Sequence, residues 1–461
     1  MTFFHNSGSR QWISEGFYYL CKIMRGLILC AVMAVALAAR GGSISFVSAT
    51  RPVLEADAPA SSGLNAVYVA DGVAGLQIVY HADSPGAQVS WQRFSTLGGG
   101  YAEPVAAASL AHDGSDWTLS NVEGDMGYII EEGGRRTYFW LVDYSRYVLT
   151  LNGLRAADEQ DCGTASLIVD GSAGIIPYYD INGRRLELSR ELTMTYNTLA
   201  YDEESGVYNP QAASVTLADA EGTIHVAASY CATEFTLEGD RFLKQWGAPV
   251  SVTSPTVEPT AVDAVATARR TDPDESDNKI NNGDDPEALG GSAPAVVEFK
   301  AAVTDAAIFT EWQMSTTEDF ADITYREAST DFTFTFDELG TTYVRFVCAN
   351  AAGSCEFTSQ TFEVSIGESQ LLCPNAFSPG ASEGVNDEWK VAYRSITSFS
   401  CTIFNRWGKK IITLTDPSQG WDGKMGGKPV PAGVYYYVIK ATGADGKKYD
   451  LSGDINIVDY K

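Results

Sequence analysis

Residues 175–188 read IIPYYDINGRRLEL, and they decide the fold class of this chain. Two apolar runs flank Asn182-Gly183, the dipeptide that two-residue β-hairpin turns favour because both turn positions take a positive φ. Short alternating runs bounded by Gly, Asp and Pro continue on both sides, as is typical of strands. The pattern around this hairpin therefore predicts a β-sandwich over residues 159–247.

The same pattern predicts two further sandwiches. Residues 64–155 contain six such runs, with Trp91 in the third, where an immunoglobulin-like domain carries a core tryptophan. Residues 251–367 resemble a PKD-like or immunoglobulin-like domain, and residues 258–268 would supply its first edge strand. The expected fold class is all-β, with immunoglobulin-like and PKD-like β-sandwich modules in series.

Residues 24–49 have the layout of a secretory signal peptide. Arg25 supplies a basic start, and the apolar stretch that follows is too short to span a bilayer. Small-x-small sites end at Ala38 and Ala49, either of which suits cleavage. We therefore assign residues 1–49 to the leader, with Met24 as the true start, and residues 50–63 to a polar tether.

The chain of 461 residues carries 59 acidic and 32 basic side chains, for a formal net charge of −27. A surface this acidic repels phosphate backbones and anionic lipid, so nucleic acid and anionic membranes are excluded as partners. Only His81, His112 and His225 follow the leader, which is few for general-base or metal chemistry. The motifs HExxH and GxSxG are absent from the sequence, so no catalytic residue is assigned.

An even number of cysteines follows the leader, which in an exported chain indicates disulfides. None lies in CxxC or beside a His, so no metal site is assigned. We favour Cys162–Cys231 and Cys373–Cys401, because each pair falls within one module. A Cys348–Cys355 hairpin and a Cys355–Cys373 clip between neighbouring modules remain open. The six candidates are Cys162, Cys231, Cys348, Cys355, Cys373 and Cys401.

Residues 271–287 (TDPDESDNKINNGDDPE) contain seven acidic residues and one Lys, inside the third module. Like charges this dense repel one another and bury no apolar surface, so we expect a mobile loop whose backbone bonds to water. Dense carboxylates would also suit calcium, although the spaced ligands of a DxDxDG-type loop are missing. Calcium is the one cofactor that the sequence leaves open, and otherwise we expect none.

Residues 371–461 differ in charge from the body, with 11 basic and nine acidic residues. They contain six ordered blocks: PNAFSP, GVND, NRWG, GWDG, VPAGVYYY and the terminal strand LSGDINIVDYK. Together these blocks closely resemble the gliding-motility-associated C-terminal domain, the type B sorting signal of the type IX secretion system of Bacteroidetes. The residues that carry the resemblance are Pro374, Asn375, Phe377, Pro379, Gly384, Val385, Asn386, Asp387, Asn405, Arg406, Trp407, Gly408, Gly420, Trp421, Asp422, Gly423, Pro431, Gly433 and Tyr435.

The resemblance implies a β-sandwich sorting domain at residues 371–461 that the type IX translocon and an outer-membrane partner protein recognise. It also implies export through the periplasm to the cell surface or the extracellular space. Within this segment, we expect Trp407 and Trp421 to belong to the sandwich core. Residues 434–439 are apolar on both faces, which indicates a central strand.

The task of the upstream modules is open to three hypotheses. A non-enzymatic adhesive or structural protein, with a glycan or protein ligand, fits serial β modules and an acidic surface best. An accessory or signalling component of the secretion or gliding machinery is the alternative. A secreted hydrolase is the second alternative, because glycosidase carboxylates could hide among so many acids.

Overall fold

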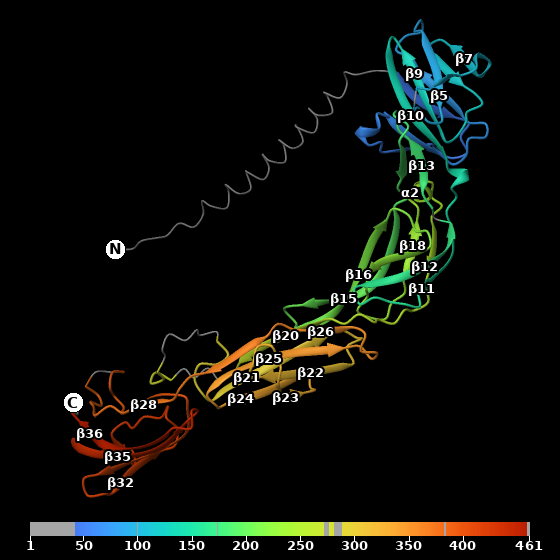
Figure 1. Ribbon diagram of the computed structural model, residues 1–461. Coiled ribbons are helices and arrows are strands. Elements are labelled where there is room, and N and C mark those ends of the chain that lie inside the picture. Colours follow the sequence, from blue (N-terminus) through green and yellow to red (C-terminus); the bar gives the residue numbers. More distant parts are fainter. Residues whose placement is uncertain are drawn as a thin grey trace, which may run out of the picture.

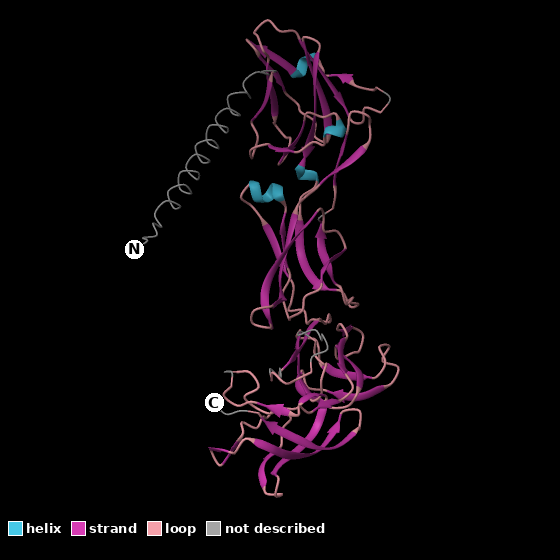
Figure 2. Ribbon diagram, turned by 90° about the vertical axis from the view of Figure 1, so that its left-hand side faces the viewer, coloured by secondary structure: helices cyan, strands magenta, loops and turns pink. Residues whose placement is uncertain are grey.

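The computed structural model describes residues 42–98, 100–172, 174–271, 276–280, 288–381 and 384–458. Four β-sandwich modules follow one another along an extended body, with the first module at one end and the C-terminal module at the other (Figure 1). Strands dominate all four modules, and the helices of the described residues are short (Figure 2). The all-β class with serial sandwiches is confirmed.

The first module packs two sheets face to face. One has the order β1-β4-β8-β7 and the other β2-β3-β10-β9-β5-β6, in which β10 runs parallel to β3. Inward residues alternate along each strand, and Trp91, only 3% exposed, lies in the core as predicted. The elements are β1 (Ser43–Val47), β2 (Leu54–Ala56), η1 (Ala60–Ser62), β3 (Ala66–Ala70), β4 (Gln77–His81), β5 (Val89–Phe94), β6 (Glu103–Pro104), η2 (Ala107–Ser109), β7 (Leu110–Asp113), β8 (Asp116–Leu119), β9 (Met126–Glu132), β10 (Arg135–Asp143) and η3 (Tyr144–Arg146).

The first module begins earlier than residue 64. β1 pairs antiparallel with β4, and Phe46 contacts the ring of Tyr68 at 4.9 Å between centroids. Assigning the leader through residue 49 is therefore wrong for residues 43–47, and cleavage after Ala49 would remove a paired strand. The error arose because the small-x-small site at Val47-Ser48-Ala49 lies inside and just after β1, where it resembles a cleavage site. Residues 1–41, which hold the rest of the predicted signal peptide, lie outside the described residues.

The second module comprises three sheets, with orders β11-β12-β17, β13-β14 and β16-β15-β18-β19. The predicted hairpin at Asn182-Gly183 is present, because β13 pairs antiparallel with β14 across it. The elements are β11 (Thr150–Ala156), β12 (Thr164–Ser172), β13 (Ile176–Tyr179), β14 (Arg185–Leu188), β15 (Leu192–Asp202), β16 (Val207–Leu217), β17 (Thr223–Ala227), β18 (Thr236–Gly239), α2 (Arg241–Gln245) and β19 (Val250–Thr253).

Both predicted limits of this module shift outward. β11 pairs with β12, and β19 pairs with β18, so the module extends from Thr150 to Thr253 rather than over residues 159–247. The run 146–154 has no strand-breaking residue at the junction. The sequence pattern therefore predicted one strand of the first module here, although the run passes from the first module into the second.

The third module has one sheet of order β20-β21-β24 and another of order β23-β22-β25-β26, with β27 also paired to β25. β20 pairs with β21, so the strands on either side of the acidic segment share a sheet, as predicted. The elements are β20 (Ala264–Arg270), β21 (Ala295–Val303), β22 (Phe309–Ser315), β23 (Ile323–Glu327), β24 (Asp331–Phe336), β25 (Gly340–Ala349), β26 (Glu356–Thr358) and β27 (Phe362–Ile366).

The C-terminal module is built on a five-stranded sheet of order β29-β36-β35-β31-β32. β35 lies in the middle, as the apolar run 434–439 predicted, but only one of its faces is buried. The elements are β28 (Gln370–Leu372), β29 (Ala376–Phe377), β30 (Ala392–Arg394), β31 (Ile396–Asn405), β32 (Lys410–Leu414), β33 (Lys424–Met425), β34 (Lys428–Pro429), β35 (Gly433–Gly443) and β36 (Lys448–Ile457).

Candidate functional site

The six sequence blocks of the C-terminal module gather at one end of its sandwich. β31 ends at Asn405 opposite Tyr435, near the start of β35, and Gly433 pairs with Ile457 at the end of β36. Phe377 pairs with Ile457 as well, through the parallel β29. The opposite end contacts the third module, since Leu339 N donates to Ala444 O in the turn between β35 and β36. We call the end that carries the blocks the tip.

Two tryptophans hold the tip together from inside. Trp389 and Trp421 are each 0% exposed and exchange two backbone hydrogen bonds, of 2.9 and 3.0 Å. Trp421 also packs against Phe377 and Tyr435 with ring centroids 5.4 and 5.1 Å apart. The core position of Trp421 is confirmed. Sequence reasoning missed Trp389, although it lies only two positions after the GVND block.

The loop between the first two blocks is organised by Asp387. Its carboxylate accepts hydrogen bonds from Gly380 N and Gly384 N, both of 2.7 Å. Asn386 takes a φ of 54° and accepts a hydrogen bond from Ser378 N through its carbonyl. Asn tolerates this left-handed conformation better than most residues, so the GVND sequence suits the turn. Val385 remains 58% exposed at the loop surface.

The NRWG block forms the turn between β31 and β32. Asn405 Oδ1 accepts hydrogen bonds from Trp407 N and Lys409 N, which closes the turn locally. Trp407 is 75% exposed, with the Arg406 guanidinium 4.2 Å from its ring centroid. The prediction that Trp407 belongs to the core is therefore wrong. Its aromatic character resembled that of Trp421, but the turn leaves its side chain exposed, with Arg406 against the ring.

The remaining blocks fix the entry into β35. Asp422 Oδ1 accepts a hydrogen bond from Lys424 N, and Gly423, at a φ of 73°, accepts one from Val430 N. The Tyr435 hydroxyl donates to Pro431 O at 2.9 Å. The other block residues are Pro374, whose carbonyl accepts from Trp389 Nε1, Asn375, whose carbonyl accepts from Asn456 N, and Pro379, Gly408, Gly420 and Gly433 in the loops and strand ends around them.

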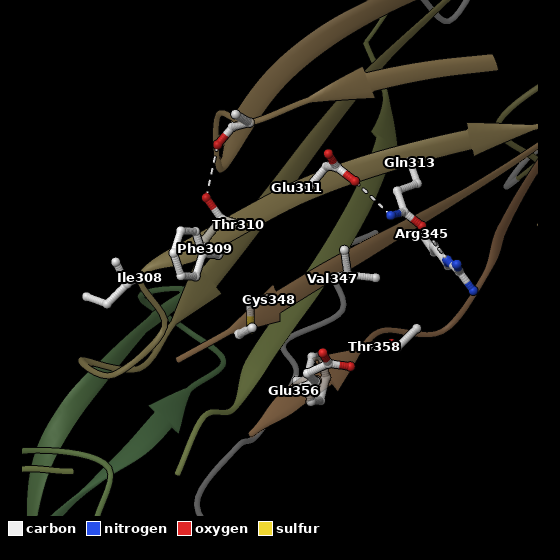
Figure 3. Close-up of a pocket in the computed structure, with 13 residues that line it drawn as sticks. Ile308, Phe309, Thr310, Glu311, Gln313, Arg345, Val347, Cys348, Glu356 and Thr358 are labelled. Atoms are coloured by element: carbon white, nitrogen blue, oxygen red, sulfur yellow. Dashed lines mark hydrogen bonds between the residues drawn. The ribbon is translucent and has the colours of Figure 1, made fainter. Parts of the chain in front are cut away.

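A groove of about 700 Å³ lies on the outer face of the third module. It follows β22 and β25, and its two ends differ (Figure 3). Ile308 and Phe309, 63% and 59% exposed, form an apolar end. Glu311, Gln313 and Arg345 form a polar end (Figure 3).

Hydrogen bonds hold the polar end of this groove in one arrangement. Gln313 Nε2 donates to Glu311 Oε1 at 2.7 Å, and Arg345 Nε donates to Gln313 Oε1 at 2.9 Å. Arg326 pairs with Glu311 from the neighbouring strand. An apolar platform beside fixed donors and acceptors suits a ligand with one apolar face and several hydroxyl or amide groups. Sequence reasoning did not find these residues, because they come from separate strands.

A disulfide joins the second and third modules. Cys162, just before β12, bonds to Cys355, just before β26, with an S–S distance of 2.03 Å. The favoured pairs Cys162–Cys231 and Cys373–Cys401 are wrong, and so are the alternatives that place Cys355 with Cys348 or Cys373. The actual partners are 193 residues apart, so no spacing within a module could indicate them.

The other four candidate cysteines are free thiols. Burial raises the pKa of Cys348 to about 11, with Asp263 adding to the effect, and burial together with nearby Cys373 raises the pKa of Cys401 to about 12. Burial also raises the pKa of Cys231 and of Cys373. These thiols remain protonated and unreactive at neutral pH.

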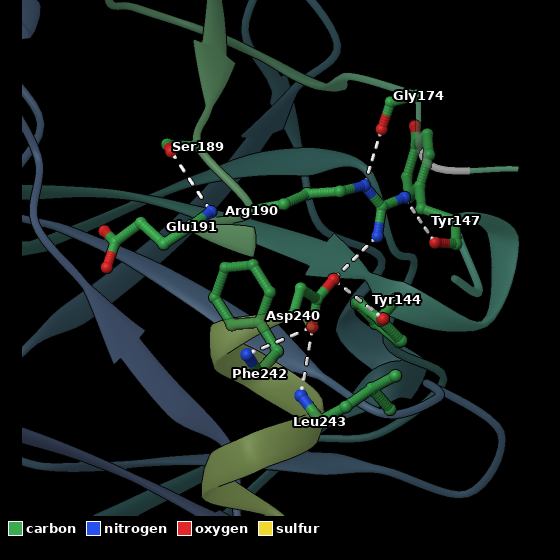
Figure 4. A network of polar contacts seen from close by, with 9 residues as sticks. All are labelled: Tyr144, Tyr147, Gly174, Ser189, Arg190, Glu191, Asp240, Phe242 and Leu243. Carbon is green, nitrogen blue, oxygen red and sulfur yellow. Dashed lines mark hydrogen bonds and ion pairs between the residues drawn. The ribbon is translucent and has the colours of Figure 1, made fainter. Parts of the chain in front are cut away.

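A hydrogen-bond network around a buried ion pair of the second module joins the first and second modules (Figure 4). Arg190, 2% exposed, donates from Nη1 to Asp240 Oδ2 at 2.7 Å and from Nη2 to Tyr147 O at 2.5 Å. Its Nε donates to Gly174 O at 2.6 Å, and the Tyr144 hydroxyl donates to Asp240 Oδ2 at 2.9 Å. Tyr144 and Tyr147 follow β10 of the first module, so the network crosses the joint. One hydrophobic core also runs through both modules.

Part of the acidic segment contacts the C-terminal module. Asn278 Nδ2 donates to Val391 O at 2.7 Å and to Pro417 O at 2.8 Å, and Ile280 N donates to Tyr393 O at 2.7 Å. For residues 276–280, the expectation that the backbone bonds to water is therefore wrong. Asn278 and Ile280 interrupt the acidic residues, and Asp277 adds an ion pair with Lys390, 3.1 Å from Oδ1 to Nζ. Residues 272–275 and 281–287, with most carboxylates of the proposed calcium ligand set, lie outside the described residues.

The three histidines differ in their surroundings. Ser45 Oγ lies 2.8 Å from His81 Nε2, and His81 Nδ1 lies 2.8 Å from Asp116 Oδ1, across β1, β4 and β8. These side chains are partly exposed on the outer face of the sheet. His112 stacks on Trp117, and His225 contacts Ser166. Over the described ranges, no group of three or more His, Cys, Asp or Glu residues is arranged to hold a metal ion.

Helices in the described part of the chain are all too short or too polar to cross a membrane. Among known families, residues 371–457 match the CHU_C type IX secretion signal domain, and residues 155–254 match the fibronectin type III domain. Together the two matches cover the C-terminal module and most of the second module. No curated protein sequence matches the chain.

Solved structures with several tandem β-domains resemble the chain at low identity. The tetra-tandem repeat of the extending region of a large adhesion protein is 12% identical, covers 84% of this chain and 97% of its own length, and has a TM-score of 0.20. The FN1–FN3 domains of chicken CNTN1 are 10% identical, cover 67% and 97%, and have a TM-score of 0.24. TM-scores this low do not establish a shared arrangement, so the fold assignment rests on the sheets and the family matches.

The family match at residues 371–457 agrees with the six blocks and with their common position at the tip. Export by the type IX system implies delivery to the cell surface or the extracellular space. The chain therefore carries a type IX secretion signal domain and a fibronectin type III domain, and it is cargo of the type IX secretion system with fibronectin-like and immunoglobulin-like modules.

Proposed function

We propose that this protein is a non-enzymatic adhesive or structural cargo that presents its outer modules on a stiff, extended body. The observation that supports this most is that residues of both neighbours bridge each joint between modules. The Arg190–Asp240 network bridges the first joint, Cys162–Cys355 the second, and Asn278 and Ile280 the third. Joints without such contacts would leave the modules free to move relative to one another.

The groove of the third module is the proposed ligand site of this adhesive function. Phe309 and Ile308 offer exposed apolar surface, and the Glu311–Gln313–Arg345 ladder offers oriented polar groups. This combination fits a glycan, or a peptide that carries both apolar and amide groups. Neither ligand needs a cofactor at this site.

Two experiments test the proposal, one on export and one on ligand binding. Deleting residues 371–461 should retain a folded protein in the periplasm, and normal surface display of the truncated protein would contradict the export route. The secreted protein should bind members of a glycan or peptide array, and Arg345→Ala should weaken that binding. Ile175→Ala, an exposed apolar change in the second module, is the control. Equal binding by both variants would exclude the groove.

A second candidate function rests on Ser45, His81 and Asp116. Their order and spacing match those of a hydroxyl nucleophile, a base and an orienting carboxylate. In such a step Ser45 Oγ would bond to the acyl carbon of an ester while the ester C–O bond breaks, and His81 would pass the Ser45 proton to the alcohol that leaves. The groove described above is not lined by these residues, so the candidate ranks second. A fluorophosphonate probe should label the wild type and spare Ser45→Ala. Equal labelling, or none, would exclude this function.

A further inference from the structure

The described residues expose apolar surface unevenly. Sixteen large hydrophobic side chains are exposed over the whole described chain, and seven of them lie between residues 371 and 458. An exported domain gains nothing in solubility from such side chains, so their concentration in one module needs an explanation. Six lie at the tip or on the outer face of β35: Val385, Trp407, Val434, Tyr436, Val438 and Val458.

The exposed side chains on β35 form one strip. Val434, Tyr436 and Val438 alternate along the strand, so all three project from the same face. Their exposures are 43%, 47% and 41%. Phe404 of β31 lies opposite Tyr436, on the same face. β31 ends at Asn405, opposite Tyr435, and the NRWG turn continues from there. Trp407 therefore follows β31 at the end where the strip begins.

Basic side chains border the strip on one side. Arg406 and Lys409 belong to the turn, and Lys410 lies opposite Phe404 in β32. These three residues form no salt bridge with any described residue, and each is exposed. The body at residues 50–370 carries a formal charge of −32, whereas residues 371–461 carry +2. Charge of this sign at the strip attracts an acidic surface and is opposite to that of the rest of the cargo.

We infer that this strip and its basic border form the surface by which the sorting domain docks on the outer-membrane partner protein of the secretion system. The inference rests on the proposed export route and adds the docking face to it. The partner surface should be apolar at its centre and acidic where it meets Arg406, Lys409 and Lys410. Trp407 has the properties of an interface anchor, because it is large, aromatic and exposed before binding.

To test this inference, the full-length chain is expressed in a Bacteroidetes host with a working type IX system, and its surface and periplasmic fractions are measured. Trp407→Ala and Lys409→Glu should each reduce the surface fraction several-fold and raise the periplasmic fraction, while the melting temperature of the purified protein stays unchanged. Tyr101→Ala, which removes an equally accessible ring from the first module, is the control for the first variant. Lys448→Glu, at the opposite end of the same module, is the control for the second. Both controls should be exported normally.

The outcomes separate this inference from the export route. If deletion of residues 371–461 blocks export but Trp407→Ala and Lys409→Glu reach the surface normally, the docking face is wrong and the route stands. If the deletion has no effect, the route itself is wrong. If Trp407→Ala instead converts a wild-type dimer to a monomer and leaves export intact, the strip serves self-association and the inference is overturned.

Discussion

Replacing Arg190 with Met should loosen the joint between the first and second modules more than any single surface change. Asp240 is 0% exposed and would keep its hydrogen bonds from Tyr144, Phe242 N and Leu243 N, but it would lose Arg190, its one charged partner among the described residues. Removing one partner of a buried ion pair typically costs about 3–5 kcal/mol, because the remaining charge stays buried without compensation. The carbonyls of Gly174 and Tyr147 would lose their donor as well.

Hydrogen exchange on the full-length protein, followed by mass spectrometry, measures this loss locally. Backbone amides in residues 144–147 and 238–243 should exchange more than about a hundredfold faster in Arg190→Met, which corresponds to about 3 kcal/mol of local stability. Arg136→Met is the matched control. Its partner Glu131 is 36% exposed, and exposed pairs contribute only about 0.2–1 kcal/mol.

A second variant separates the charge from the packing. Asp240→Asn keeps the cap on α2 and removes the negative charge, so Arg190→Met with Asp240→Asn should recover part of the lost protection. If Arg190→Met exchanges no faster than Arg136→Met, the network does not hold the joint. If the double variant is no better protected than Arg190→Met, the loss comes from packing and the reasoning about the buried charge is refuted.

Three further predictions concern the other joints and the thiols. Cys162→Ser should split the unfolding of the second and third modules into separate calorimetric transitions, because the cross-link constrains a segment of 193 residues, worth about 5 kcal/mol in the chain-entropy model; an unchanged thermogram would contradict the coupling. Asn278→Ala should speed tryptic cleavage after Lys279 by removing two hydrogen bonds to the C-terminal module, and equal rates would show that the contact protects nothing. The raised pKa of Cys401 stabilises the fold below the ordinary thiol pKa, and this contribution should fall as pH rises from about 9 toward 12, by about 1.4 kcal/mol per pH unit, because the unfolded thiol ionises first. Cys401→Ala should flatten the decline of the unfolding free energy over that range, and an identical slope in both proteins would refute this.

Most of the local features could be predicted from sequence. Strand alternation and turn residues act over a few positions, so the hairpin at Asn182-Gly183 and the core position of Trp91 followed directly. Module limits were harder to place, because residues 147–150 (YVLT) cross a joint without a Gly, Pro, Asn or Asp to mark it. Burial of individual aromatic residues was also hard to predict, as Trp407 and Trp421 show. Both are aromatic residues in glycine-containing blocks, and only the direction of the chain at each turn decides which one is buried.

The all-β class, the series of modules and the secretion signal follow from the amino-acid sequence alone, because each depends on residues that are close together along the chain. Tertiary structure alone decided how the modules join. Cys162 meets Cys355, Tyr144 meets Asp240, and Asn278 meets Val391 only when separate sandwiches lie against one another. These contacts depend on the relative placement of whole modules, and no local pattern of apolar and polar residues encodes that placement.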